Sequence, residues 1–244
     1  MISAIRDLIR TARSVAVLTG AGISAESGIP TFRDAGGLWR NFRAEDLATP
    51  QAFARDPKLV WEWYNWRRSL IAQAEPNAGH YALAELEKRI PDFTLITQNV
   101  DGLHDRAGSM RLLKIHGDIW TLRCTACGCE RRDLRPSLPQ LPPLCECGGP
   151  CQGFARPGVV WFGEGLPPAI WAKSEEAAAN ADVFLVIGTS AMVYPAAGLV
   201  HLAQASGAKV VEVNPAETPV SRMVAFTWRA PAAEALPLLV NQTE

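Results

Sequence analysis

The sequence lacks an excess of charge of either sign, because 24 Lys and Arg residues stand against 25 Asp and Glu residues in a chain of 244 residues. Counterion release can then supply little affinity for nucleic acid, which is not an expected partner. The sequence also lacks an apolar run near the ~18 residues of a membrane span. Arg6, Asp7, Arg10 and Arg13 interrupt the stretch where a signal peptide needs apolar residues. We therefore expect a cytoplasmic protein without a membrane partner.

Cysteine is absent outside one short window. All six cysteines fall between Cys124 and Cys151, and in a reducing compartment such a cluster predicts metal ligands rather than disulfides. Hydrophobic residues make up 48% of the chain and charged residues 20%. This composition excludes disorder, collagen and coiled coil, and the length suits one large domain with a small insert.

Short buried-strand patterns alternate with helical patterns along the rest of the chain. The predicted strands are Val15–Thr19, Phe93–Thr97, Val183–Ile187 and Lys209–Val213. The predicted helices are Ile2–Ile9, Pro57–Ala74, Gly79–Arg89 and Pro195–Ala205. Alternation of this kind predicts an α/β fold with a parallel sheet of the Rossmann type and helices on both of its faces.

The cysteine window has the spacing of a structural zinc site. Cys124-x2-Cys127-Gly128 is followed by Cys145-x-Cys147-Gly148, close to the pattern of a four-thiolate site. Because a glycine after the second cysteine suits a tight turn toward sulfur, we predict Cys124, Cys127, Cys145 and Cys147 as the ligands. Cys151 could replace Cys145 or Cys147. This proline-rich stretch has few apolar residues, so bound zinc would stabilise its fold.

These patterns predict a division of the chain. We expect a small zinc-binding insert at about residues 119–157 and a large domain made of residues 1–118 and 158–244.

A glycine turn follows the first predicted strand. Gly20-Ala21-Gly22-Ile23-Ser24-Ala25 fits the pattern G-x-G-x-x-G/A, which lets a pyrophosphate approach backbone N–H groups at a helix N-terminus. The alternative is a tight strand-to-helix turn without a ligand. No acidic residue ends a second strand about 20 residues later, which argues against a hydride-transfer enzyme. Residues Glu26–Gly37 predict a long loop over the cofactor rather than an immediate helix.

Seven segments occur in an order that carries a family resemblance. They are GAGISAESGIPTFRD (Gly20–Asp34), TQNVDGLH (Thr97–His104), KIHGD (Lys114–Asp118), the cysteine window, GVVWFGE (Gly158–Glu164), IGTS (Ile187–Ser190) and EVNP (Glu212–Pro215). Together they resemble the sirtuin family of NAD-dependent protein-lysine deacylases. The resemblance implies an NAD-binding large domain of the Rossmann type, a zinc-ribbon small domain, and a cleft in which NAD and an acyl-lysine peptide meet. The products would be nicotinamide and O-acyl-ADP-ribose.

The resemblance also implies roles for individual residues. His116 matches the family's catalytic histidine, which takes a proton from a ribose hydroxyl, and Asn99 would position the ribose or a water molecule. The implied cofactor residues are Gly20, Ala21, Gly22, Ser24, Phe32, Arg33, Gln98, Asn99, Asp101, Gly188, Thr189, Ser190 and Asn214. We interpret His80, His104 and His201 as structural histidines.

Tyr64 and Arg67 indicate the class of acyl group. They stand three residues apart in a predicted helix and therefore share a face. On periodicity alone they could be rim residues of an amphipathic helix. Tyr64-Asn65-Trp66-Arg67 is, however, similar to the Y-x-x-R of the class III sirtuins, which remove succinyl, malonyl and glutaryl groups. Ala48 matches a small residue that leaves room for the larger acyl group.

The substrate peptide is expected at GVVWFGE. The resemblance implies that Val159, Val160, Trp161, Phe162, Gly163 and Glu164 bind it as an added β-strand, whereas the alternative is an ordinary buried strand. Two other functions remain open for the whole chain: a mono-ADP-ribosyltransferase, or a non-catalytic module that binds NAD and zinc. The joint presence of His116, Asn99, Tyr64 and Arg67 favours the deacylase.

Overall fold

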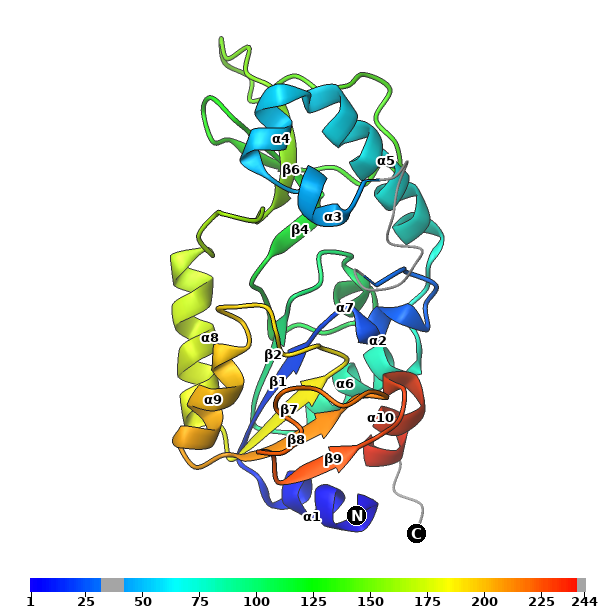
Figure 1. Cartoon of the computed structure of the whole chain (residues 1–244), viewed down its shortest axis with the longest axis vertical. Helices are drawn as coiled ribbons and strands as arrows, with labels where there is room; N and C mark the ends of the chain where they lie inside the picture. The colour runs from blue at the N-terminus through cyan, green and yellow to red at the C-terminus, as the bar shows by residue number, and fades with distance from the viewer. Residues whose placement is uncertain (32–41, 241–244) are drawn as a thin grey trace.

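The computed structural model describes residues 1–31 and 42–240. A large lobe holds a six-stranded sheet, and a smaller lobe holds a three-stranded sheet together with α3 (Ala44–Leu47), α4 (Pro50–Arg55) and α5 (Pro57–Gln73) (Figure 1). The N-terminus and the last described helix, α10 (Ala232–Val240), lie at the end of the molecule opposite the small lobe. None of the helices in the described residues combines the length and the apolar character that crossing a membrane requires.

The six-stranded sheet has the order β3-β2-β1-β7-β8-β9. Every neighbouring pair is parallel, as the alternating pattern predicts. Its strands are β1 (Ser14–Thr19), β2 (Asp92–Thr97), β3 (Leu112–Lys114), β7 (Val183–Ile187), β8 (Lys209–Val213) and β9 (Phe226–Trp228). Thr19 pairs with Thr97 on one side and with Ile187 on the other, so the three central strands end level at one edge.

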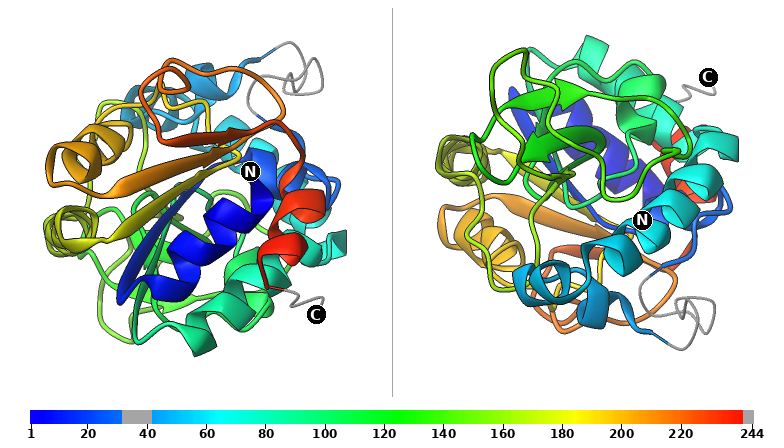
Figure 2. Two further views of the ribbon diagram at one scale, coloured as in Figure 1. Left: turned by 90° about the horizontal axis from the view of Figure 1, so that it is seen from below. Right: turned by 90° about the horizontal axis from the view of Figure 1, so that it is seen from above.

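Helices cover both faces of this sheet, as Figure 2 shows. Successive side chains of β1 point to opposite faces, so Val15 and Val17 pack on one side while Ala16 and Leu18 pack on the other. The first face is covered by α1 (Ile2–Thr11), α6 (Ala78–Arg89) and α10 (Ala232–Val240), and the second by α8 (Pro168–Asn180) and α9 (Gly198–Ala205). Burial on both faces explains why the central strands are continuous apolar runs.

The small lobe is built on an antiparallel sheet of order β5-β4-β6. Its strands are β4 (Gly117–Cys124), β5 (Glu130–Arg132) and β6 (Ala155–Val159). Strands β4 and β6 share one hydrophobic core with three helices that precede them in the sequence: α3 (Ala44–Leu47), α4 (Pro50–Arg55) and α5 (Pro57–Gln73). The division at residues 119–157 stays a prediction, and the packing joins that insert to these helices.

Candidate functional site

The loops that follow β1 and β7 are joined by backbone hydrogen bonds at the edge of the sheet where these strands end. The N–H of Gly20 donates to the Ile187 oxygen at 3.1 Å, and the N–H of Gly22 donates to the Gly188 oxygen at 2.7 Å. A Cβ on Gly22 would lie 2.7 Å from that same oxygen, and Gly188 has a φ of +56°. This close approach alone requires glycine at both positions, so the glycine turn is not by itself evidence for a cofactor.

A single helical turn, α2 (Gly22–Ala25), begins directly after the glycine turn. The first residue of α2, Gly22, is bonded through its N–H to the Gly188 oxygen in the loop after β7. The loop was predicted for residues 26–37, and residues 26–31, which the structure describes, form turns and irregular backbone rather than a continued helix. The predicted cofactor residues Phe32 and Arg33 lie outside the described residues.

Ser24 lies at the centre of a buried polar network. Its hydroxyl donates to Asp101 Oδ2 at 2.8 Å and lies 3.4 Å from His80 Nε2. The N–H of Asn77 faces His80 Nδ1 at 3.3 Å, so Nδ1 accepts and Nε2 carries the ring proton. Burial raises the pKa of Asp101 and lowers the pKa of His80 to about 4.

His80 and His104 are buried and lie next to predicted cofactor residues, and their structural role stays a prediction. Their ring centroids are 4.9 Å apart. His104 Nε2 lies 3.0 Å from the Thr19 hydroxyl, which donates to Thr97 at 2.8 Å. Sequence reasoning did not place these histidines near the site, because only the fold brings α6, α7 (Leu103–Arg106) and β1 together.

We predict that these buried histidines make the fold sensitive to mild acid. The folded protein keeps His80 neutral down to a pKa of about 4, whereas the unfolded chain takes up protons below about pH 6.5. The unfolded state then binds more protons, so stability falls as the pH falls. The loss from His80 is about 2 kcal/mol between pH 6.5 and 5, at ~1.4 kcal/mol per unit.

Urea unfolding at pH 7, 6 and 5 checks this. His80→Gln should flatten the fall, and His201→Gln, at an exposed position on α9, should leave it unchanged. Identical slopes in all three proteins would contradict the prediction.

The amides of Gln98 and Asn99 have defined orientations at the end of β2. Asn99 Nδ2 donates to the Gly20 oxygen at 3.1 Å and to the Ser24 hydroxyl at 3.2 Å, which leaves Oδ1 as its acceptor. Gln98 Nε2 donates to Thr189 Oγ1 at 2.9 Å. Asn214, at the end of β8, donates to the Thr189 carbonyl at 2.7 Å.

The structure therefore brings the predicted cofactor residues of four strand ends to one edge of the sheet. Ligands of open parallel sheets bind at this edge. Ser190 follows Thr189 directly in the same loop.

His116 lies in the loop between β3 and β4 and is partly buried. Its Nδ1 is 3.0 Å from the Gln98 carbonyl oxygen, which can only accept, so Nδ1 carries the proton and Nε2 has a free lone pair. Burial lowers the pKa of His116 below its usual 6.5, although the bond to Gln98 opposes the shift. At neutral pH the ring is therefore neutral and can act as a base through Nε2.

The segment after β6 connects His116 to the predicted acyl-binding residues. The N–H of Val160 donates to the His116 oxygen at 2.9 Å, and the N–H of Phe162 donates to the Ala48 oxygen at 2.9 Å. Between them, Trp161 Nε1 donates to the Tyr64 hydroxyl at 2.9 Å. Because that hydroxyl oxygen accepts, its own proton remains for donation. Burial raises the pKa of Tyr64 to about 12, so the phenol stays neutral.

Arg67 lies one helical turn from Tyr64, as predicted, and lines a pocket with Ile29, Thr31, Trp66 and Leu70. A residue that sequence reasoning missed, Trp63, contacts both members of the pair. Its ring lies edge-on to Tyr64 at 4.6 Å and beneath the Arg67 guanidinium at 5.2 Å. Burial lowers the pKa of Arg67, opposed by the nearby Tyr64 and Asp101.

The carboxylate of Glu164 is hydrogen-bonded to other residues of the chain. Its carboxylate accepts from Arg156 at 2.6 and 2.8 Å and from the N–H of Trp161 at 2.8 Å, and the Arg156 guanidinium lies 3.3 Å from the Trp161 ring centroid. Phe162 is 48% exposed and Gly163 has a φ of +87°. The N–H groups of Val160, Trp161 and Phe162 are thus all used internally, and Glu164 closes the turn that follows them.

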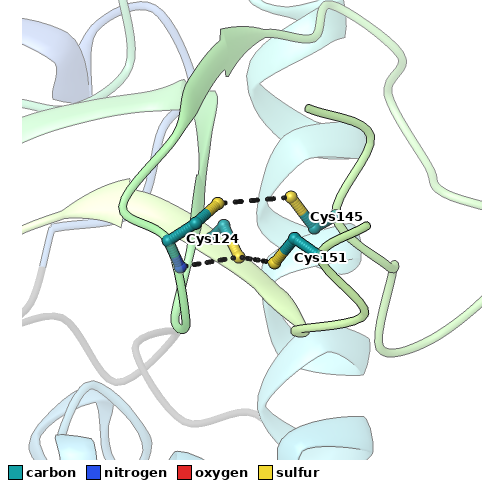
Figure 3. Close-up of side chains that lie close together, drawn as sticks. Cys124, Cys145 and Cys151 are labelled. Carbon is teal, nitrogen blue, oxygen red and sulfur yellow. Dashed lines mark hydrogen bonds between the residues drawn. The ribbon is translucent and has the colours of Figure 1, made fainter. Parts of the chain in front are cut away.

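Four sulfur atoms converge at the far end of the small lobe. The Sγ atoms of Cys124, Cys127, Cys145 and Cys151 all lie within 4.8 Å of one another, and Figure 3 shows Cys124, Cys145 and Cys151 pointing toward each other. The Cys124 to Cys151 distance is 3.5 Å and the Cys127 to Cys145 distance is 3.7 Å. A tetrahedral zinc with bonds of ~2.3 Å needs sulfurs about 3.8 Å apart. The cluster therefore fits one structural zinc ion.

The fourth ligand differs from the prediction, because Cys151 takes the place predicted for Cys147. The N–H of Gly153, two residues after Cys151, donates to its sulfur at 3.5 Å, just as the N–H of Ala126 donates to Cys124 at 3.4 Å. A Cβ on Gly153 would lie 2.9 Å from the Cys124 sulfur. The glycine that permits the turn toward sulfur is therefore Gly153, not the predicted Gly148, and Cys147 is left exposed.

Comparison with known proteins adds independent findings. The model describing the Sir2 family matches residues 20–195. An NAD-dependent protein deacylase of Aquifex aeolicus is 54% identical over 223 residues, which cover 91% of this chain and 92% of that protein. An enzyme of the same description from Thermus thermophilus is 53% identical over 239 residues, covering 96% and 92%.

Solved structures are similar over the whole chain. A complex of a Sir2 homologue with NAD superposes with a TM-score of 0.91 at 45% identity, covering 98% of this chain and 92% of that one. A Sir2 protein with a deacetylated p53 peptide and 3'-O-acetyl ADP-ribose gives a TM-score of 0.85 at 30% identity, covering 99% and 98%.

Proposed function

The chain belongs to the Sir2 family and is an NAD-dependent protein deacylase, and we propose that it prefers lysine acyl groups that end in a carboxylate, such as succinyl, malonyl and glutaryl. One observation carries this proposal. Tyr64 and Arg67 share a face of α5, and the Tyr64 hydroxyl is bonded to Trp161, in the same short segment that contacts His116. Acetyl-lysine would be a weaker substrate.

Several residues would serve the reaction itself. NAD supplies the ADP-ribose that accepts the acyl group. We propose that the loops at Gly20–Gly22, Gln98–Asn99 and Gly188–Ser190 bind it, with Asn99 Oδ1 accepting from a ribose hydroxyl or a water molecule. His116 Nε2 would take a proton from a ribose hydroxyl, because the bond from Nδ1 to Gln98 holds the ring in the tautomer that can accept one.

The acyl pocket has two donors for a distal carboxylate. The guanidinium of Arg67 can hold it with two parallel hydrogen bonds, and the neutral Tyr64 hydroxyl can add a third. A hydrogen bond to a charged group is worth roughly 1.5–3 kcal/mol, which is about 10- to 100-fold in selectivity. Ala48 is bonded through its backbone to Phe162, and we propose that its small side chain leaves room for a longer acyl group.

The peptide around the lysine would bind along the segment from Gly158 to Glu164 by β-strand addition. The N–H groups of Val160, Trp161 and Phe162 already have partners within the chain. An added strand would therefore have to use other backbone groups of this segment.

Arg67→Met is expected to lower the ratio of kcat/KM for succinyl-lysine over acetyl-lysine peptide by about 10- to 100-fold. Methionine keeps much of the side-chain volume but removes the fork that binds the carboxylate, so the KM for the succinyl peptide should rise. Tyr64→Phe should act in the same direction more weakly. Steady-state kinetics at fixed NAD measure the ratio.

Lys58→Met is the matched control, because Lys58 is an exposed cation on the same helix. An equal fall for both substrates in Arg67→Met would show that Arg67 is structural and that the enzyme is a general deacetylase. The same reactions with labelled NAD test mono-ADP-ribosyl transfer, which would leave label on the protein substrate.

A further inference from the structure

Helix α5 presents two adjacent faces, about 100° apart around its axis. The first is bonded to the loops of the small lobe, and the second carries Arg67 and Tyr64, whose hydroxyl is bonded to Trp161. On the first face, Trp61 Nε1 donates to the Ala155 oxygen at 2.8 Å. One turn later, Asn65 forms a two-way pair with the Leu138 backbone, with Nδ2 to O at 3.0 Å and N to Oδ1 at 3.1 Å.

Arg68 continues the same face by one more turn. Its guanidinium is 0% exposed, donates to Asp133 Oδ1 at 3.1 Å and also to the Asp133 carbonyl, and lies 5.1 Å from the Trp120 ring centroid. Asp133 Oδ2 also accepts hydrogen bonds from two arginines close to it in the sequence, Arg131 at 2.9 Å and Arg135 at 2.5 Å. These bonds fix the position of the carboxylate that Arg68 binds.

These contacts alternate in sequence with the acyl-binding residues. Asn65 follows Tyr64, and Arg68 follows Arg67, so each hydrogen-bonded residue is adjacent to a residue of the pocket. A helix rises 1.5 Å and turns about 100° per residue. A small slide or rotation of α5 against the loop at Asp133–Leu138 would therefore displace Tyr64 and Arg67 relative to Trp161.

We propose that Asn65 and Arg68 are positioning residues for acyl selectivity. They fix the register of α5 against the small lobe, and this register sets where Tyr64 and Arg67 meet the acyl carboxylate. Trp161, which donates to the Tyr64 hydroxyl, follows β6 of the same small lobe. Tyr64, Arg67 and Trp161 are therefore all positioned by the small lobe, whereas the NAD-binding loops follow strands of the large sheet and His116 lies at the junction of the two sheets, between β3 and β4. The inference rests on the proposed preference for acidic acyl groups.

The test is a double-mutant cycle between Asn65→Ala and Arg67→Met. Asn65→Ala should lower the succinyl-to-acetyl ratio of kcat/KM by about tenfold, through the KM of the succinyl peptide, while the KM for NAD stays constant. In the Arg67→Met background the same substitution should leave the ratio unchanged, because the guanidinium that Asn65 is proposed to position is no longer present. Ser69→Ala is the control, because its bond to the Pro136 oxygen is exposed and long at 3.3 Å.

A second variant keeps the test decisive if Asn65→Ala does not fold. Asn65→Asp keeps the side-chain volume and can still accept from the Leu138 N–H, but it cannot donate to the Leu138 oxygen. A fall in melting temperature with an unchanged ratio, or an additive effect in the Arg67→Met background, overturns the inference. If the unmodified enzyme shows no preference for the succinyl peptide, the proposed function has failed instead, and the two failures are distinguishable.

Discussion

His116→Ala is expected to lower deacylation by about 100- to 10,000-fold while the protein still folds and binds NAD. The loss follows from the removal of the one imidazole nitrogen, Nε2, that can accept a proton, and general-base catalysis contributes a factor of this size. The side chain is only partly buried, and its hydrogen-bond partner is the backbone oxygen of Gln98, so little packing is lost. Nicotinamide release and mass spectrometry of the peptide measure turnover, and thermal unfolding reports the fold.

His201→Ala is the matched control, since His201 is exposed on α9 away from the sheet edge. The pH profile gives a second readout. The pKa of His116 is lowered below 6.5 and only the neutral ring is a base, so kcat/KM should be constant near pH 7 and fall as the pH drops through that pKa. Undiminished turnover in His116→Ala would exclude His116 as the base.

The central strands could be predicted because a strand that is buried on both faces needs a continuous run of apolar residues. β7 and β8 are buried on both faces, and their apolar runs match the predicted ranges Val183–Ile187 and Lys209–Val213. The edge strands β3 and β9 were not predicted. Each has three residues and only partial burial, so pairing with a neighbour determines it more than its own sequence does.

Helix α10 was missed for a related reason. It contains Pro237, which propensity counts against a helix, but its packing on α6 and the sheet outweighs this cost.

The candidate site also contains residues that the sequence predicted and contacts that it did not. Gln98 was predicted from the family resemblance and Thr189 also from its place after a strand, because ligands of open parallel sheets bind where the strands end, and the two side chains are hydrogen-bonded at 2.9 Å. The contacts of Ser24 with His80 and Asp101 join positions 56 and 77 residues apart, and no local pattern predicts them. The contacts of Asn65 and Arg68 with the small lobe are equally invisible in the sequence, since an asparagine and an arginine in a helix are normally solvent-exposed.

Cys151→Ser is expected to release the zinc that Cys147→Ser retains. The wild-type protein should bind about one equivalent, and loss of one of four thiolates should weaken zinc binding at least about 100-fold, because metal binding and folding of such modules are one process. The small-lobe core that includes Trp61 and Leu122 lies next to the cluster, so the melting temperature should fall as well. Zinc content after dialysis and competition with a chromogenic chelator measure both variants.

Cys147→Ser is the natural control because it removes an exposed thiol from the same loop without entering the cluster of four sulfurs. The contrast also tests the reason for the corrected assignment. If sequence spacing determines the ligands, Cys147, which precedes Gly148, is needed for zinc binding. If the backbone donors determine them, Cys151 is needed, because the N–H of Gly153 donates to its sulfur. Zinc lost from Cys147→Ser and kept by Cys151→Ser would reverse the assignment and restore the ligand set that spacing predicts.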